Sequence, residues 1–203
     1  MESPKIVIEH LEPKLSTWLL FEYENSSKLL KKNILFTNVK SRRTKERLMR
    51  FGKVKRRSVL DIFSHKKLVI LDPHAKKVLA PKDLSRDTIA VVGGILGEHP
   101  PRGRTKALLT TKAPNAKTRN LGREQFTIDG AVYIIKKIIE DKKISAIPTK
   151  HGLILRAKLK PSGVYEVELP YAYPVVAGKP IISEKLVHYL MKNKKSKITW
   201  RNH

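Results

Sequence analysis

The chain has 203 residues, enough for one full α/β domain with a small appendage. It contains no cysteine, which excludes disulfides, cysteine-based zinc sites and thiol catalysis. Its 43 Lys and Arg outnumber 18 Asp and Glu, and the net charge of +25 favours a polyanionic partner such as RNA. The sequence shows neither an apolar signal segment nor an apolar run of membrane-spanning length, so we expect a cytoplasmic protein without a membrane partner.

The first ninety residues alternate strand-like and helix-like segments. Ser16 is the predicted N-cap of a helix that runs to about Lys32, and Ser41 that of a short basic helix ending at Gly52. Because strands separated by helices usually form parallel sheets, this order predicts an α/β fold with a mostly parallel sheet flanked by helices. The expected strands are 5–11, 34–39, 67–71 and 88–92, and a helical turn is expected at 58–63.

The second half of the chain contains the end of the expected core and, after residue 145, a different sequence pattern. A short strand at 117–121 and a helix at 129–141 complete the expected core. Alternating apolar residues around a Pro-Ser-Gly turn then predict a β-hairpin. We therefore divide the chain into an α/β core at 1–145 and a C-terminal extension at 146–203. The extension is expected to contain strands at 151–159 and 164–169, a helix at 183–192 and a basic tail from 193 that frays.

The strongest local charge lies between residues 40 and 57, where ten basic residues accompany a single acid, Glu46. Besides RNA binding, this excess of cations fits a solvent-exposed face without a partner or the lysine enrichment of thermophilic proteins. Thermophile surfaces, however, usually add glutamate together with lysine, and here the acids are missing. A polyanion that neutralises the repulsion explains the pattern better. The predicted RNA-binding residues are Lys40, Arg42, Arg43, Lys45, Arg47, Arg50, Lys53, Lys55, Arg56, Arg57 and, further along, Arg102.

A glycine-rich segment, VVGGILGEHPPRGRT at 91–105, follows directly after a predicted buried strand. Such loops at strand ends are where open α/β sheets usually bind small molecules. A dinucleotide-binding loop requires a helix immediately after its glycines, and Pro100 and Pro101 block that helix. A phosphate-binding loop with Gly-Lys-Ser/Thr is absent as well. The segment therefore predicts a ligand loop of another class.

A second segment, RNLGREQFTIDG at 119–130, leads into the apolar helix. Together, GGILGEHPPRGRT and RNLGREQFTIDGAV resemble the SPOUT methyltransferases of archaea and eukaryotes, S-adenosylmethionine-dependent enzymes expected to act on RNA. One eukaryotic branch of that family instead methylates an arginine of a small-subunit ribosomal protein. The resemblance extends to VIEHLEP at 7–13 and ELPYAY at 168–173, and so covers nearly the whole chain. It implies an α/β knot fold with a deep C-terminal trefoil knot, and methyl transfer by the core at 1–145.

The resemblance also implies a cofactor site, because the knot loops of this family hold S-adenosylmethionine in a bent shape, largely through backbone amides. A plain tight turn at Gly93 and core packing of Leu121 and Phe126 are the alternatives. The segment 70–72 is a further expected contributor. The residues expected to bind the cofactor are Gly93, Gly94, Ile95, Leu96 and Gly97 in the first loop and Asn120, Leu121, Gly122, Gln125 and Phe126 in the second.

Methyl transfer is an in-line displacement that needs an aligned acceptor and, where the acceptor carries a proton, a base. Glu98 and Asp129 are the candidate bases, with Glu124 behind them, and a helix N-cap is the alternative role for Asp129. Arg104 is the third catalytic candidate. The seven histidines show no metal-ligand spacing, so no metal is expected. Arginines that flank both loops would grip a target phosphate or pair with these acids: Arg102, Arg104, Arg119 and Arg123.

Three functions follow from these features. The leading hypothesis is a methyltransferase acting on rRNA or tRNA, with the basic segment as its docking surface. The alternative is arginine methylation of a small-subunit ribosomal protein, which charge disfavours because both proteins are basic and an arginine acceptor requires carboxylates. A ribosomal protein already bound to rRNA would remove that objection. The third hypothesis is an RNA-binding module without catalysis. Both a homodimer and a monomer are compatible with the sequence.

Overall fold

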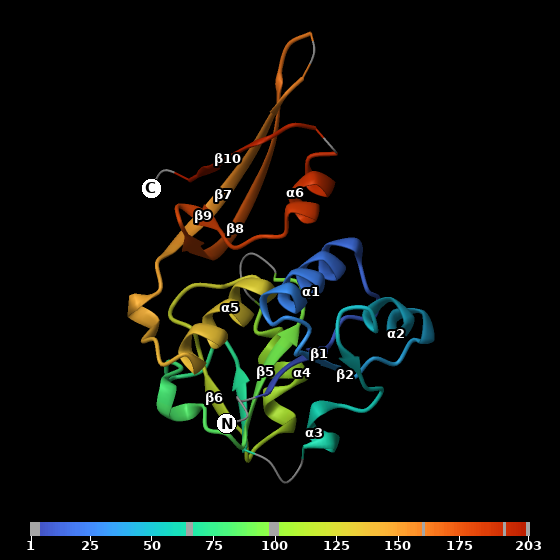
Figure 1. Ribbon diagram of the computed structural model, residues 1–203, viewed down its shortest axis with the longest axis vertical. Coiled ribbons are helices and arrows are strands. Elements are labelled where there is room, and N and C mark those ends of the chain that lie inside the picture. The colour runs from blue at the N-terminus through green and yellow to red at the C-terminus, as the bar shows by residue number, and fades with distance from the viewer. Residues whose placement is uncertain (1–4, 64–66, 98–101, 160, 193, 202–203) are drawn as a thin grey trace.

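The computed structural model describes residues 5–63, 67–97, 102–159, 161–192 and 194–201. Two sheets organise the chain, one inside a helix-covered body and one in a projection above it (Figure 1). The first sheet has the strand order β3-β2-β1-β5-β4-β6, and each of its pairings is parallel. Its strands are β1 (Lys5–His10), β2 (Leu35–Thr37), β3 (Lys53–Val54), β4 (Lys67–Leu71), β5 (Thr88–Gly94) and β6 (Lys117–Arg119).

Helices cover both faces of this sheet, which explains why its central strands are almost continuously apolar. Successive strand residues point to opposite faces, so Ile8 belongs to one buried cluster and Val7 to another. The first cluster packs under α1 (Thr17–Leu29), α2 (Arg42–Leu48) and α5 (Ile128–Ile139), and the second over α3 (Val59–Ile62). The predicted α/β class with a mostly parallel, helix-flanked sheet is confirmed. The first helix after β5 is α4 (Arg104–Leu108).

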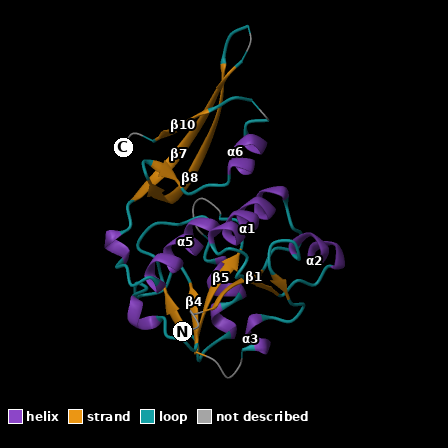
Figure 2. Cartoon of the chain, viewed as in Figure 1, coloured by secondary structure: helices purple, strands orange, loops and turns teal. Residues whose placement is uncertain are grey.

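The second sheet is antiparallel, and its long strands extend away from the body (Figure 2). Its order is β10-β7-β8-β9, and α6 (Glu184–Leu190) packs on it through Val187. The predicted hairpin is confirmed, although both strands are longer than expected. The strands are β7 (Thr149–Lys158), β8 (Val164–Val176), β9 (Lys179–Pro180) and β10 (Lys197–Trp200), and short 3-10 turns elsewhere span Pro81–Asp83, Thr110–Lys112 and Ile144–Ala146.

Three expectations about element ends are wrong. Residues 197–200 of the tail are ordered and do not fray, because they form β10, which pairs with β7, and Trp200 packs on the second core under the ammonium of Lys150. The basic helix ends at Leu48, before Gly52, where a Cβ would lie 2.6 Å from the carbonyl oxygen of Ile34. The helix expected to begin at Asp129 begins at Ile128. Its N-cap is Thr127, whose hydroxyl oxygen accepts from the backbone N–H of Gly130.

Helix α1 connects the two cores. Leu19 and Tyr23 on one side are fully buried against the parallel sheet, while Trp18 packs with the second core. Glu24 of α1 forms an ion pair of 2.7 Å with Lys185 of α6. The position of the second sheet over the first therefore depends on this helix.

All strands of the second sheet fall inside the predicted C-terminal extension at 146–203, and that division of the chain stays a prediction. The trefoil knot implied by the resemblance also stays a prediction. In the described parts of the chain, every helix is too short or too polar to cross a lipid bilayer.

Gly94 provides a test of this packing. A Cβ at Gly94 would lie 2.0 Å from the hydroxyl of Tyr23 and 2.9 Å from the carbonyl of Glu9, whereas a Cβ at Gly93 would meet nothing closer than 3.4 Å. We expect Gly94→Ala to lower the free energy of unfolding by about 1–3 kcal/mol, a cost typical of overpacking. Urea denaturation measures it, with Gly93→Ala as the control expected to stay near wild type. Equal stability of the two variants would contradict the described packing.

Candidate active site

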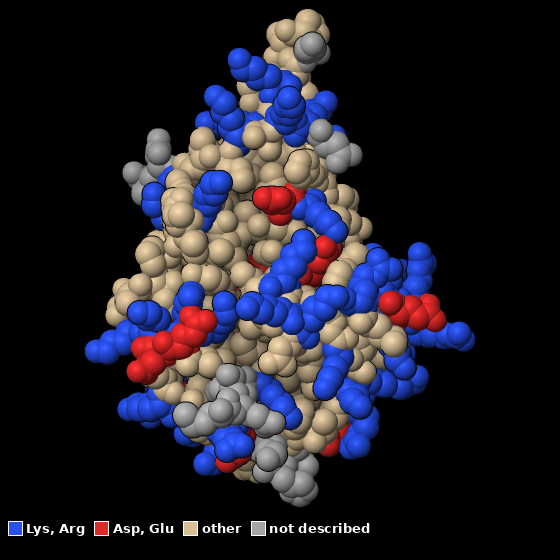
Figure 3. Space-filling model, in the orientation of Figure 1, with Lys and Arg blue, Asp and Glu red and all other residues tan. Residues whose placement is uncertain are grey.

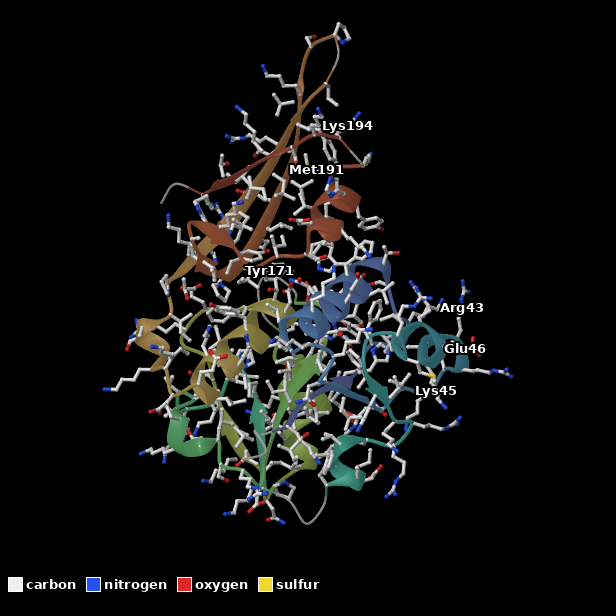
Figure 4. All side chains as sticks on the ribbon, viewed as in Figure 1. Arg43, Lys45, Glu46, Tyr171, Met191 and Lys194 are labelled. Carbon is white, nitrogen blue, oxygen red and sulfur yellow. The ribbon has the colours of Figure 1, made fainter. Side chains whose placement is uncertain are left out.

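A pocket opens where β4 and β5 end, between the parallel sheet, α1 and β8. Its cavity volume of about 180 Å³ is roughly a dozen times the minimum that holds one water molecule, so it has room for an organic ligand. Residues of both predicted ligand loops line it, together with Trp18 and Glu22 of α1 and Tyr171 of β8. Tyr171 lies in the part of the second sheet that faces the helices of the body (Figure 4). The site is thus built from segments that are far apart in the sequence.

In the first loop, Gly93, Ile95, Leu96 and Gly97 line the pocket as expected, but Gly94 does not. Gly94 is the last residue of β5, and its Cα faces Tyr23 and the backbone of β1. Strand alternation explains this outcome, because neighbouring residues of β5 point to opposite sides. The close approach to Tyr23 and Glu9 gives Gly94 a packing role, and its predicted contact with the cofactor stays a prediction.

Glu12 holds the first loop, and no sequence pattern indicated this role. Its Oε1 accepts from the backbone N–H of Leu96 at 3.1 Å, and both its oxygens accept from Arg104, at 2.9 and 3.1 Å. Arg104 follows the loop and Leu96 lies within it, so one carboxylate ties both sides of the loop to the segment after β1. Arg104 lies beside a smaller second cavity rather than in the pocket, as does Arg102. The geometry therefore favours a positioning role for Arg104 over its expected catalytic one.

In the second loop, Asn120, Leu121, Gln125 and Phe126 line the pocket, and Gly122 does not. Gln125 contacts the first loop, because a Cβ on Gly97 would lie 2.4 Å from its Nε2. The hydroxyl of Tyr171 donates to the carbonyl of Gly97 at 2.8 Å. The Oε1 atom of Gln125 is buried and has no hydrogen-bond partner among the described residues. Such an orphaned acceptor indicates a place for a ligand N–H.

Glu22 is the buried acid of the pocket, with an exposed fraction of 3 %. Its Oε1 accepts from the indole Nε1–H of Trp18 at 2.6 Å, and its Oε2 from the backbone N–H of Ile128 at 3.0 Å. Burial raises the pKa of Glu22 to about 8, and the negative charge of Asp129 adds to the rise, while the two hydrogen bonds oppose it. The sequence did not indicate Glu22, because a glutamate within an amphipathic helix is normally assigned to the solvent face.

Asp129, a predicted base, lies outside the pocket lining and is 1 % exposed. Its Oδ2 accepts from the side-chain amide of Asn25 at 2.7 Å, and its Oδ1 from the backbone N–H of Gly130. Burial raises its pKa as well, against the hydrogen bonds that favour its charged form. Asp129 therefore acts on Glu22 through its charge. It lies outside the pocket lining, a position that does not fit direct contact with an acceptor.

The other predicted site residues are dispersed. Glu98 falls outside the described residues. Glu124 lines the pocket with a half-exposed side chain 3.4 Å from His151. Arg119 is bound by Asp83 through two hydrogen bonds of 2.6 and 2.8 Å, which hold the pKa of Asp83 below its ordinary range. Arg123 is exposed and away from the pocket lining.

The pocket differs in charge from the rest of the molecule. Three carboxylates line it, those of Glu22, Asp72 and Glu124, and none of its described lining residues is Lys or Arg. Lys and Arg side chains are spread over the visible surface instead (Figure 3). Where the chain is described, no three His, Asp or Glu side chains are grouped as a metal site would require.

The basic segment forms one surface around α2 and β3, which we call the α2 surface. Arg43 and Lys45 extend from α2 into solvent (Figure 4), beside the exposed ion pair between Arg42 and Glu46. Arg47 differs from the expectation, since it is half-buried and donates to the carbonyl of Leu15. The exposed members of the α2 surface are Lys40, Arg42, Arg43, Lys45, Arg50, Lys53, Lys55, Arg56 and Arg57.

Known proteins resemble the chain over nearly its whole length. A family model described as protein arginine N-methyltransferase SFM1-like matches residues 5–197. Protein arginine N-methyltransferase SFM1 of Saccharomyces cerevisiae is 29% identical over 208 residues, which cover 93% of this chain and 95% of the relative. The crystal structure of yeast SFM1 complexed with SAM has a TM-score of 0.80 at 27% identity, covering 96% of this chain and 92% of that one.

Two further solved structures are similar. Yeast SFM1 complexed with SAH has a TM-score of 0.77 at 28% identity, and the match covers 92% of this chain and 94% of that one. The dual-specific Trm10 from Thermococcus kodakaraensis has a TM-score of 0.58 at 18% identity, covering 70% of this chain and 95% of that one. The last likeness concerns the fold alone.

The raised pKa of Glu22 makes stability depend on pH. Because the folded state holds the proton more tightly than the unfolded chain, whose ordinary pKa is 4.5, the contribution of Glu22 to the free energy of unfolding should fall as pH rises from about 5 to about 8. Glu22→Gln should remove this contribution and leave that of Asp129, whose pKa is also raised. Urea denaturation at several pH values measures the slope.

The matched control is Glu24→Gln on the same helix. Its ion pairs lower the pKa of Glu24, so it titrates below this pH window and its removal should leave the slope unchanged. A slope equal to wild type in Glu22→Gln would show that Glu22 is ionised in the folded protein at pH 5.

Proposed function

The chain belongs to the SFM1-like family of protein arginine N-methyltransferases, and we propose that it transfers a methyl group from S-adenosylmethionine to an arginine side chain of a protein. The expected enzyme class, an S-adenosylmethionine-dependent methyltransferase of the SPOUT type, is confirmed by the family match and the solved relatives. RNA as the methyl acceptor, the leading hypothesis from the sequence, finds no support there. The arginine alternative does, because the relatives matched over nearly their full length are arginine methyltransferases.

The residues of the pocket fit S-adenosylmethionine. The loops offer backbone amides and apolar side chains, and the orphaned Oε1 of Gln125 is an acceptor suited to an amino group of the cofactor. When bound, S-adenosylmethionine supplies an electrophilic methyl group on a positively charged sulfur. The residues that we assign to its binding are Gly93, Ile95, Leu96, Gly97, Asn120, Leu121, Gln125 and Phe126.

The charge of the pocket is the observation that carries the choice of acceptor. A guanidinium group stays protonated at any physiological pH, so a site for arginine needs negative charge and the absence of competing cations. Asp72 and Glu124 place carboxylates in the lining, Glu22 adds one whose charged form an entering cation favours, and the described lining contains no Lys or Arg. The same carboxylates would repel the phosphates that flank a nucleotide. The chain as a whole has few carboxylates and a net charge of +25, but three of them lie in the pocket, where an arginine acceptor requires them.

We also propose that the protein substrate is bound to RNA when it is methylated. The α2 surface carries nine exposed cations and one acid, Glu46, and would repel a free basic protein. A ribonucleoprotein particle presents phosphates to this surface while its protein component presents arginine to the pocket. RNA is then the docking partner, and the ribosome or a precursor of it is a candidate particle.

Methyl transfer from labelled S-adenosylmethionine tests the acceptor directly. Ribosomal particles and free RNA from a strain that lacks this gene serve as substrates, followed by nuclease or protease digestion and amino-acid analysis. We expect the label to be released by protease and recovered as methylarginine. Label that only nuclease releases would return the acceptor to RNA.

Charge reversal tests the α2 surface. The variant Arg43→Glu, Lys45→Glu, Lys55→Glu, Arg56→Glu should lower kcat/KM on particles roughly tenfold or more at about 0.1 M salt, because phosphate contacts are lost, with SAH affinity unchanged. The control reverses four exposed lysines elsewhere, Lys82, Lys112, Lys142 and Lys143, for the same change in net charge. Equal losses in both variants would mean that net charge acts and that no local docking surface exists.

A further inference from the structure

A groove separate from the pocket lies between α1 and α6, where the second sheet meets the body (Figure 1). Its cavity volume of about 470 Å³ falls within the range of small-molecule sites. Neither the pocket nor the α2 surface shares a described residue with it. Two aromatic rings, two lysines and a histidine line the groove: Phe21, Tyr189, Lys185, Lys192 and His188.

Helical spacing brings the α6 side of the groove together. Lys185, His188 and Tyr189 follow one another at intervals of three and one residues, which places them on one face of the helix. Lys192 continues this face in the turn that follows α6. Val187, on the opposite face, is buried in the core of the second sheet. The face that lines the groove is therefore not needed for that core.

The two rings are arranged so that ring faces stay open. The centroids of Phe21 and Tyr189 are 6.0 Å apart and their planes differ by 68°, which is an edge-to-face contact. Such a contact covers at most one face of one ring. Tyr189 is 51% exposed, and every other described aromatic residue is more buried. A flat ligand ring can therefore stack on Tyr189.

The groove also carries an excess of positive charge. Glu24 forms ion pairs of 2.7 Å with Lys185 and of 3.2 Å with Lys28, so one carboxylate serves two ammonium groups. The ammonium of Lys192 lies 5.3 Å from the centroid of the Tyr165 ring, a contact that positions the cation without neutralising it. An anion at this groove meets cations that the protein itself leaves uncompensated.

Exposed cations continue from the groove in both directions. Lysines follow α6 at positions 194, 195 and 197, and the first of them is labelled in Figure 4. On the other side, the α2 surface adjoins the start of α1, because Arg47 of α2 donates to the carbonyl of Leu15. Phe21 lies in the second turn of α1. A chain of phosphates can therefore run past the groove along the surface.

We propose that the groove between α1 and α6 binds single-stranded RNA, with one base stacked on Tyr189 and the neighbouring phosphates held by Lys185 and Lys192. Aromatic rings next to cations are the recurring arrangement of proteins that bind single strands without reading their sequence. Both faces of a base are covered inside a duplex, so the groove selects unpaired nucleotides. An acidic protein segment would use the lysines but would gain no stacking.

This inference deepens the proposed function, since it rests on RNA as the docking partner. It does not depend on which group accepts the methyl. The α2 surface then holds the backbone of the particle, and the groove holds an unpaired nucleotide of it.

The first experiment compares Tyr189→Leu with Tyr189→Phe. Leucine keeps an apolar side chain against Phe21 but has no ring face, whereas phenylalanine keeps the ring. In fluorescence anisotropy with a labelled oligouridylate of about ten nucleotides, we expect Tyr189→Leu to bind about tenfold more weakly than wild type. Tyr189→Phe should match wild type, and both variants should keep wild-type SAH affinity. Equal oligouridylate affinity of Tyr189→Leu and wild type would overturn the proposal.

Salt dependence tests the phosphate contact. In Lys192→Gln, the slope of log affinity against log salt should become shallower by about 0.7, the value of one phosphate contact on a single strand. Tyr189→Leu should leave the slope unchanged, because it removes stacking alone. The control Lys142→Gln replaces an exposed lysine outside the groove and should keep the wild-type slope. A wild-type slope in Lys192→Gln would reject the assigned phosphate contact.

Photo-crosslinking of wild-type protein with an oligouridylate that carries 4-thiouridine locates the bound strand without any variant. We expect crosslinks in the peptide that contains Tyr189. Crosslinks confined to residues 40–57 would assign the strand to the α2 surface and reject the groove. Binding of oligoglutamate that Tyr189→Leu abolishes, without crosslinking of RNA, would assign the groove to an acidic protein and also reject the proposal.

These outcomes are distinguishable from failure of the proposed function. Crosslinking at Tyr189 without methylation of arginine in any protein would retain the groove and reject the function. Methylation of protein arginine by an enzyme that does not crosslink at Tyr189 would retain the function and reject the groove.

Discussion

The carboxylate of Glu22, fixed between the indole of Trp18 and the backbone N–H of Ile128, connects the parts of this structure. It ties α1 to the start of α5, and α1 in turn carries the contacts between the parallel sheet and the second sheet. A buried charge costs stability unless its hydrogen bonds are satisfied. The structure nevertheless keeps this carboxyl group in the pocket, where a cationic ligand would favour its charged form.

Charge is separated by position in this molecule. The exterior carries most of the 43 Lys and Arg residues, and the pocket carries carboxylates without described cations. An exterior of this kind attracts a polyanion over distances of about 8–10 Å at physiological salt, whereas the pocket acts only on a group that enters it. The two features together fit a basic protein presented on RNA. The basic exterior alone does not distinguish an RNA methyltransferase from an arginine methyltransferase, whereas the carboxylates of the pocket favour an arginine acceptor.

Much of the fold was predictable from the sequence, because strand and helix periodicity and the caps Ser16 and Ser41 are local signals. The motif resemblance placed both ligand loops, and eight of the ten expected cofactor residues line the pocket. Gly94 does not line the pocket because the glycine-rich motif begins inside β5, where alternation turns that residue away. Glu12 and Glu22 were missed for another reason. Their roles depend on contacts 84 to 106 residues distant in sequence, and a single glutamate gives no local sign of burial.

An acidic pocket that accepts arginine must bind the side chain through its positive charge. Calorimetry on the SAH-loaded enzyme, with an arginine peptide and the same peptide carrying citrulline, measures this most directly, because citrulline keeps the shape of arginine and removes the charge. We expect the arginine peptide to bind at least ~10-fold more tightly, a difference of about 1.4 kcal/mol. Equal affinities for the two peptides would show that the pocket does not select arginine by its charge.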